Sequence, residues 1–135
     1  MNPEPIEPAT AGEPADALKL VGEALSDGDL EAAVALYDPG ATLMLATDNK
    51  LCQTGEVRQA LGELMATRLP VEVWVTRELT TGDLALVLAV RTISGSAIDG
   101  SVVKLAGEGG AVLRRDPERG WLVVVDDWNL IAQPA

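Results

Sequence analysis

Histidine and phenylalanine are absent from this chain, and cysteine and tyrosine occur once each, as Cys52 and Tyr37. The absence of histidine excludes the usual zinc and haem sites and the Ser-His and Cys-His catalytic pairs. A single cysteine cannot form an internal disulfide. We therefore expect no metal and no cofactor, and an interior filled by Leu, Val and Ala.

Basic residues are scarce as well: 10 Lys and Arg stand against 21 Asp and Glu, which gives a formal net charge of -11. Nucleic acid and anionic membrane surfaces repel such a chain, so we expect neither as a partner. The N-terminus lacks the positive start and the apolar run of a signal peptide, and no later segment is apolar for long enough to cross a bilayer. The sequence predicts a cytoplasmic protein.

The 135 residues suffice for one domain with a single core. Residues 1–13 contain three prolines and three acids but no base, a composition that predicts a disordered, acidic, proline-rich tail. We expect the folded domain to span residues 14–132.

Apolar residues follow a helical period in the first half of the chain and an alternating period after Pro70. The helical spacing predicts three helices, of which the first begins at Pro14. Alternation predicts strands in the second half, with turns at Gly82 and Gly100. A further turn is predicted at residues 47–50. The expected helices are 14–25, 30–37 and 54–65, and the expected strands are 41–46, 71–76, 84–93, 101–106, 111–115 and 121–128.

This order of elements predicts an α+β fold in which three N-terminal helices cover one face of a bent antiparallel sheet. The run Gly107–Gly110 lacks the strand-to-helix context of a phosphate loop and indicates a bulge or sharp bend. The strands that start at Leu84 and Leu122 are apolar on both faces, and the helices can cover only one face. We expect a second copy of the chain to bury the other face, which predicts a homodimer through the sheet.

Short motifs recur along the chain in a characteristic order: Ala24–Glu31 with Ala35–Tyr37 and Ala41–Leu43, then Gly55–Leu61, Gly82–Val87, and Val112–Arg115 with Gly120–Trp121. In this order the sequence resembles the nuclear transport factor 2-like superfamily, in particular its ketosteroid isomerase-like and SnoaL-like members. The resemblance implies a cone-shaped fold with the helices on the concave face of the sheet, an interior pocket and, commonly, a dimer. It implies no single function, since the superfamily includes isomerases, dehydratases, cyclases, epoxide hydrolases and proteins without catalysis.

The catalytic residues of the steroid isomerases are not carried over. Those enzymes use an Asp base and an oxyanion hole of Tyr and protonated Asp. Ungapped matching around the shared motifs places Val21, Leu45 and Gly110 at these positions, and none of them can move or donate a proton. The histidine of dehydratase-like relatives is missing too, and the last strand carries Asp126 and Asp127 where relatives often have Asp-His.

Asp126 and Asp127 end the apolar run of the last strand. Neighbours on a strand point to opposite faces, so a shared-proton pair is excluded unless the strand bulges. In the phase implied by the resemblance, Asp126 faces outward, and the residues that face the cone are Trp121, Val123, Val125 and Asp127. Asp127 is therefore the predicted catalytic acid or base; the alternative is a strand-end carboxylate in water or paired with an arginine.

Five further residues are predicted to bind a ligand: Glu72, Trp74, Tyr37, Arg91 and Trp128. Glu72 and Trp74 share one strand face and would set a carboxylate beside an aromatic wall, unless that face is the outer one and carries a dimer-contact tryptophan. Arg91 lies on a largely apolar strand and would pair with Asp127 or receive an anionic ligand, unless it is an edge charge. Tyr37 is expected on the apolar face of the second helix, as a core residue or as a donor to an oxyanion.

Two hypotheses for function follow. The first is binding of a small apolar molecule in the cone, with proton transfer by Asp127 in an isomerase-, cyclase- or hydrolase-like reaction. The second is a non-catalytic homodimeric interaction or structural module whose cavity is filled by its own side chains. Whether Asp127 faces a cavity separates the two.

Overall fold

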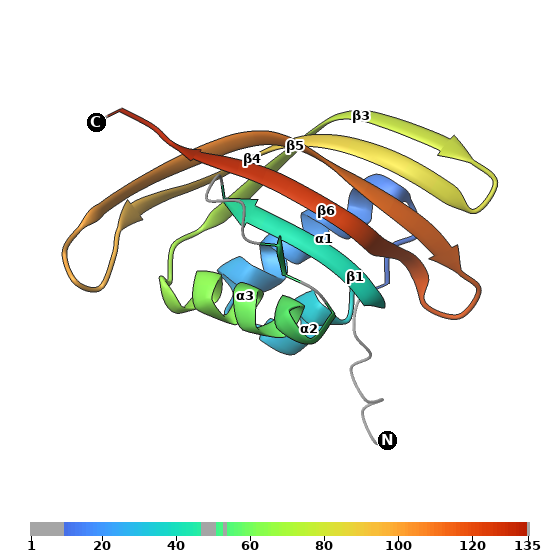
Figure 1. Ribbon diagram of the computed structural model, residues 1–135, viewed down its shortest axis with the longest axis horizontal. Coiled ribbons are helices and arrows are strands. Elements are labelled where there is room, and N and C mark those ends of the chain that lie inside the picture. The colour runs from blue at the N-terminus through green and yellow to red at the C-terminus, as the bar shows by residue number, and fades with distance from the viewer. Residues whose placement is uncertain (1–9, 47–50, 53, 135) are drawn as a thin grey trace, which may run out of the picture.

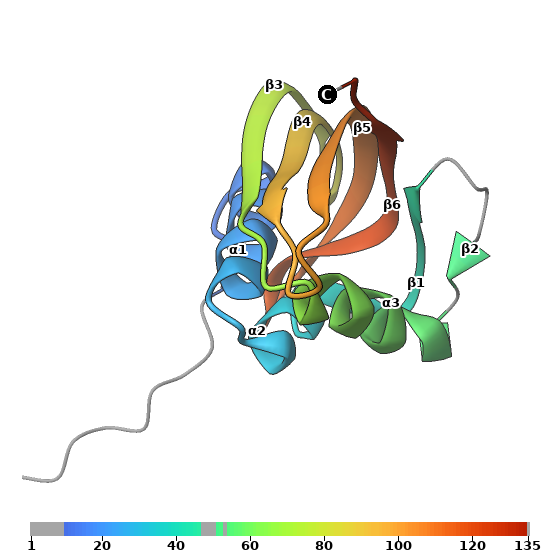
Figure 2. The same ribbon diagram turned by 90° about the vertical axis from the view of Figure 1, so that its left-hand side faces the viewer.

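The computed structural model describes residues 10–46, 51–52 and 54–134. Its helices lie together beneath the concave face of one bent sheet (Figure 1, Figure 2). The predicted α+β cone with three helices on the concave face is confirmed. The elements are α1 (Pro14–Ser26), α2 (Leu30–Val34), β1 (Tyr37–Ala46), β2 (Leu51–Cys52), α3 (Thr54–Ala66), β3 (Val71–Thr81), β4 (Leu84–Ser96), β5 (Val102–Asp116) and β6 (Gly120–Ala132).

The sheet has six strands in the order β2-β1-β6-β5-β4-β3. All neighbouring strands are antiparallel except β1 and β6, which run parallel. The closing strand β6 therefore lies inside the sheet, between β1 and β5. Two strands expected at 101–106 and 111–115 form the single strand β5, since the glycines between them stay in the sheet.

Helix α1 packs directly on β3. A proline suits its first position because the N–H of that position has no partner inside a helix. A Cβ on Gly22 would lie only 2.7 Å from Cγ2 of Val73, so glycine permits this close approach. At the end of α1, Oγ of Ser26 donates to the Val71 carbonyl at 3.2 Å and accepts from the Val71 N–H at 2.9 Å, which fixes the helix to the first residue of β3.

The second helix is shorter than predicted. Oδ1 of Asp29 accepts the N–H of Ala32 at 3.1 Å and so caps α2, which ends at Val34. The N–H of Val123 donates to the Leu36 carbonyl at 2.9 Å, which ties the chain to β6. Tyr37 is therefore the first residue of β1, and its placement on a helix face was wrong.

The interior is filled mainly by aliphatic side chains from α1, α3 and the inner face of the sheet, as expected from the composition. Ala11, which lies in the segment predicted to be a tail, is buried, and its carbonyl accepts the N–H of Trp121 at 3.1 Å. The predicted turn at 47–50 lies outside the described residues. In the part of the chain that the structure describes, no helix is long and apolar enough to cross a membrane.

Candidate functional site

A bulge in β6 decides which aspartate enters the cone. Leu113 of β5 pairs with Val123, but the preceding Val112 pairs with Val125, so Val124 is an extra residue in β6. An extra residue moves all later side chains to the opposite face of the sheet. Asp126 is consequently buried and Asp127 is exposed, and the predicted orientation of the two aspartates was wrong.

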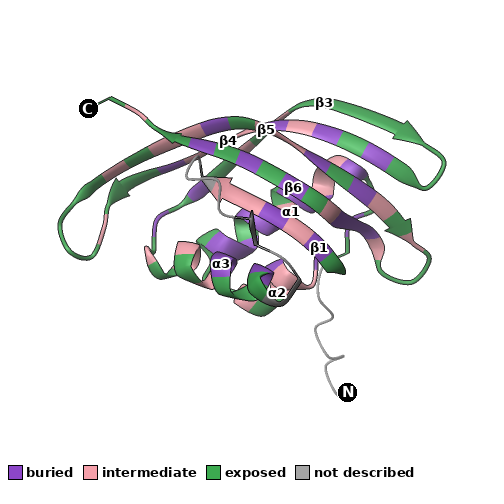
Figure 3. Cartoon of the chain, in the orientation of Figure 1, coloured by how far each residue is buried: buried purple, intermediate pink, exposed green. Residues whose placement is uncertain are grey.

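The inward-facing residues of β6 change with the same shift. Trp121 and Val123, before the bulge, lie in the core as predicted. Val125 lies on the outer face with Asp127, against the prediction. The alternation of buried and exposed residues along the strands is visible in Figure 3. The bulge thus divides β6 into two segments of opposite phase.

Asp126 is the centre of a buried polar cluster. Its Oδ2 accepts a hydrogen bond from Oη of Tyr37 at 2.6 Å and another from Nε1 of Trp128 at 2.8 Å. Its Oδ1 lies 2.9 Å from Nη2 of Arg91, and both side chains of this ion pair are only 2% exposed. The cluster joins β1, β4 and β6 through one carboxylate, which we call the Asp126 cluster.

Arg91 pairs across the sheet with Gly107 of β5, which has no side chain. Its guanidinium carbon lies 4.5 Å from the centre of the Trp128 ring, within the range of a cation–π contact. Nη2 is used in the ion pair, but Nη1 has no hydrogen-bond partner among the described residues although it is buried. Nη1 of Arg91 is therefore a buried donor group without a hydrogen-bond partner among the described residues.

The Asp126 cluster offers no free acid or base. The carboxylate is already bound by two neutral donors and one cation. Burial, and after it the charge of Asp126, raise the pKa of the Tyr37 phenol well above its ordinary value of 10.0. Tyr37 thus remains a protonated donor to Asp126 at neutral pH.

The raised pKa of Tyr37 predicts loss of stability in alkali. Above pH 10.0, the ordinary pKa, the unfolded chain releases the phenolic proton while the folded chain retains it. The contribution is therefore fully present below that pH and declines as the pH rises toward the higher folded pKa. Because Tyr37 is the only tyrosine, the ultraviolet absorbance of phenolate should increase only together with unfolding monitored by circular dichroism. Phenolate formation near pH 10.0 in the folded protein would contradict the burial of Tyr37.

Of the residues predicted for the site, Tyr37, Arg91 and Trp128 come together inside the cone. Asp127, Glu72 and Trp74 do not, because all three lie exposed on the outer face of the sheet. For Glu72 and Trp74 this is the alternative that the sequence left open. Asp126 was missed because alternation was extended through β6, and the run of valines before it carries no signal for the bulge.

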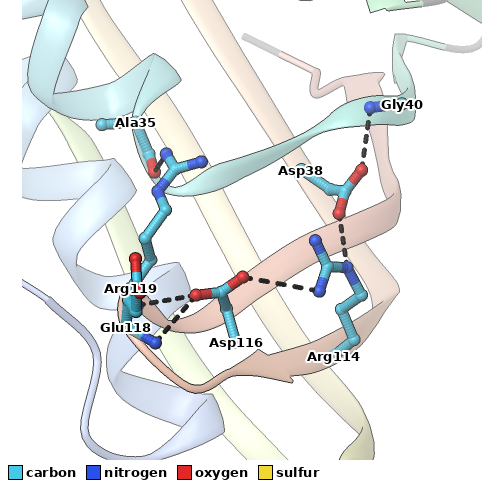
Figure 4. A network of polar contacts seen from close by, with 7 residues as sticks. All are labelled: Ala35, Asp38, Gly40, Arg114, Asp116, Glu118 and Arg119. Atoms are coloured by element: carbon cyan, nitrogen blue, oxygen red, sulfur yellow. Dashed lines mark hydrogen bonds and ion pairs between the residues drawn. The ribbon is translucent and has the colours of Figure 1, made fainter.

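A surface depression of about 440 Å³ lies beside the start of β1, and Tyr37 contributes to its wall. Near it, Nε of Arg114 donates to Oδ2 of Asp38 at 2.5 Å, and Nη2 of Arg119 donates to the Ala35 carbonyl at 2.8 Å (Figure 4). The N–H of Gly40 and then Arg114 hold the pKa of Asp38 below its usual value. The depression is lined by Glu31, Val34, Ala35, Tyr37, Asp38, Pro39, Val57, Arg58 and Arg119.

The acids around this depression are engaged by partners within the chain. Glu31 pairs with Arg58, and Asp116 accepts the N–H groups of Glu118 and Arg119 at 2.9 Å each. No group of three or more potential metal ligands occurs among residues 10–46, 51–52 and 54–134. The depression is therefore a surface feature whose acidic side chains are already engaged.

No family model and no curated protein matches the sequence. Solved structures match the fold over most of its length. A ketosteroid isomerase-like protein from Erwinia carotovora atroseptica has a TM-score of 0.75 at 17% identity and covers 90% of this chain and 95% of its own. A protein from Streptomyces avermitilis, provisionally named as a dehydratase of the nuclear transport factor 2-like family, has a TM-score of 0.65 at 24% identity, with 88% and 91% covered.

A third similar structure is a domain from Xanthomonas campestris, provisionally named as an association domain of calcium/calmodulin-dependent protein kinase II. Its TM-score is 0.70 at 18% identity, and the match covers 96% of this chain and 98% of that one. The TM-scores establish the fold, and identities this low leave the activity open. The chain has the nuclear transport factor 2-like cone fold, as its resemblance to the ketosteroid isomerase-like proteins implied.

Proposed function

We propose that the protein is a non-catalytic homodimeric module that associates through the outer face of its sheet. The observation that carries the proposal is a row of exposed apolar side chains that crosses four strands in register. Leu79 of β3 pairs with Leu86 of β4, Leu86 with Val112 of β5, and Val112 with Val125 of β6. We call these four residues the apolar row.

The apolar row is unusual for a face in contact with water. The exposed fractions are 55% for Leu79, 39% for Leu86, 38% for Val112 and 46% for Val125. An antiparallel sheet with one solvated face normally alternates apolar and polar residues, with the polar ones outward. Contiguous exposed apolar side chains indicate a surface that another molecule covers.

Two further observations support a second copy as that molecule. The described residues on the inner face of the sheet pack into one buried core with the Asp126 cluster, whereas the outer face keeps large apolar side chains exposed. One structure with the same fold carries the name of an association domain. Association through this face is also what strands that are apolar on both sides require.

Binding of a small molecule in the cone is a second candidate function. It is favoured by Nη1 of Arg91, which has no hydrogen-bond partner among the described residues, since a buried donor without a partner can bind a ligand oxygen. A carboxylate or carbonyl group on an otherwise apolar molecule fits a cation beside the Trp128 ring. This candidate is a binding function without proton transfer, because Asp127 lies outside the cone and the carboxylate of Asp126 is already bound.

The substitution Val112→Glu tests the proposed dimer. Each dimer would bury two unpaired carboxylates in an apolar contact, so we expect the dissociation constant to rise about 100-fold or more. Sedimentation equilibrium of the wild type and the variant measures this change. Ile98→Glu is the matched control, because Ile98 is 75% exposed but lies in the β4–β5 connection, outside the apolar row. A wild type that stays monomeric at high micromolar concentration would refute the proposal.

A further inference from the structure

A second row of residues crosses the sheet beside the apolar row. It has a positive charge at one end and a negative charge at the other. In register, Arg77 of β3 pairs with Leu88 of β4, Leu88 with Gly110 of β5, and Gly110 with Asp127 of β6. Paired residues of a sheet project from the same face, and Leu88 lies on the outer one. Arg77 reaches this face because a register shift in β3 separates it from Val75.

Neither charge has a side-chain partner among residues 10–46, 51–52 and 54–134. Arg77 and Asp127 are both exposed, and neither makes an ion pair or hydrogen bond with the described residues. Between them stands a single side chain, that of Leu88, whose Cδ2 lies 3.1 Å from where a Cβ of Gly110 would be. Across the sheet, the row therefore consists of the cation of Arg77, the apolar side chain of Leu88 and the anion of Asp127.

We propose that the two copies are related by a two-fold axis that runs along the strands between β4 and β5, so that Arg77 of each copy pairs with Asp127 of the partner subunit. The inference rests on the proposed homodimer and specifies its geometry. Rotation about such an axis exchanges β3 with β6 and β4 with β5. It brings opposite charges together twice in each dimer, as the self-complementary contact of a two-fold interface requires.

The same rotation also matches the apolar row to itself. Leu79 comes to face Val125 of the partner subunit, and Leu86 faces Val112 of the partner subunit. Sheets that pack face to face in the aligned arrangement lie about 10 Å apart. An extended Arg side chain and an Asp side chain together span that gap, so the ion pair fits the spacing at which the aliphatic residues meet.

A different axis is disfavoured by the pairing already present in one chain. A two-fold axis across the strands, between the two rows, would set Glu108 of β5 against Arg114 of the partner subunit. Arg114 is already bound by Asp38 at 2.5 Å and lies 3.7 Å from Asp116. That axis would also leave Arg77 and Asp127 over apolar side chains, where an unpaired charge is costly.

Charge reversal at the two positions tests the axis. Arg77→Asp alone sets two aspartates together twice in each dimer, and Asp127→Arg alone does the same with two arginines. We expect each variant to weaken the dimer about 100-fold in sedimentation equilibrium. Mixing the two variants should restore wild-type affinity as a heterodimer, because both contacts then join opposite charges. Native mass spectrometry with one variant isotopically labelled identifies the heterodimer.

The double variant Arg77→Asp/Asp127→Arg should dimerise like the wild type. If circular dichroism shows that a single variant does not fold, the double variant provides the test instead. A mixture and a double variant that stay as weak as the single variants would overturn the axis, while dissociation by Val112→Glu would still support a dimer. A monomeric wild type would instead refute the proposed function itself.

Discussion

Replacing Arg91 by methionine is expected to lower the free energy of unfolding by about 3–5 kcal/mol. The substitution keeps most of the side-chain volume but leaves the Asp126 carboxylate buried without a cation, with both side chains only 2% exposed in the native pair. Denaturant unfolding followed by circular dichroism measures the loss. Glu23→Gln, at an exposed carboxylate on α1 away from the outer face of the sheet, is the control and should change stability by less than about 0.5 kcal/mol.

The double variant Arg91→Met/Asp126→Asn separates the ion pair from the cost of leaving one charge alone. It removes both charges and keeps an amide oxygen that accepts from Tyr37 and Trp128. Much of the stability lost in Arg91→Met should return, because the uncompensated buried charge is gone. A double variant as unstable as the sum of the two single ones would show that the pair contributes no coupling energy.

The same double variant tests the second candidate function. Small amphipathic carboxylates that bind Nη1 of Arg91 would raise the melting temperature of the wild type and leave that of the double variant unchanged. Equal shifts in both proteins would place any bound ligand outside the Asp126 cluster. The absence of any shift would leave the non-catalytic module as the function that the structure supports.

The second large effect is expected from Gly109→Ala, which should lower the free energy of unfolding by about 3 kcal/mol or more. A Cβ at this position would lie 1.8 Å from the carbonyl oxygen of Asp127. That oxygen belongs to the backbone of β6, so no side-chain rotation relieves the overlap. Gly107 is constrained in the same way by the carbonyl oxygen of Asn129, at 2.2 Å.

Gly110→Ala is the matched control for this prediction. Its nearest contact is Cδ2 of Leu88 at 3.1 Å, the end of a flexible side chain on the outer face. We expect a loss of about 1 kcal/mol or less, because Leu88 can rotate away. Urea unfolding of the two variants compares them directly, and equal losses would contradict the close approach of β5 and β6 at Gly109.

The order of helices and strands follows from the sequence because hydrophobic periodicity acts locally. The bounds of α1 and α3 agree with the predicted helices within a residue. The end of α2 was mispredicted because a hydrogen bond between Leu36 and the distant Val123 decides it. The extent of a strand depends on a partner that local spacing does not specify.

The candidate site was harder to predict for the same reason. Arg91, Tyr37 and Trp128 were predicted as site residues. Arg91 pairs with Asp126 rather than with Asp127, and Asp126 also accepts hydrogen bonds from Tyr37 and Trp128. The bulge at Val124 makes that choice, and it arises from how β6 pairs with β5. One inserted residue was enough to exchange a core carboxylate for a surface one.

The position of β6 inside the sheet has a consequence for how the protein is made. During synthesis, β1 emerges early, but its parallel neighbour β6 emerges after all the other strands. Until then the edge of β1 is unpaired, and Tyr37 and Arg91 lack the carboxylate that they share. The pairing of β1 with β6 can form only after translation of β6. Until then, the nascent domain exposes the unpaired edge of β1 that β6 later covers.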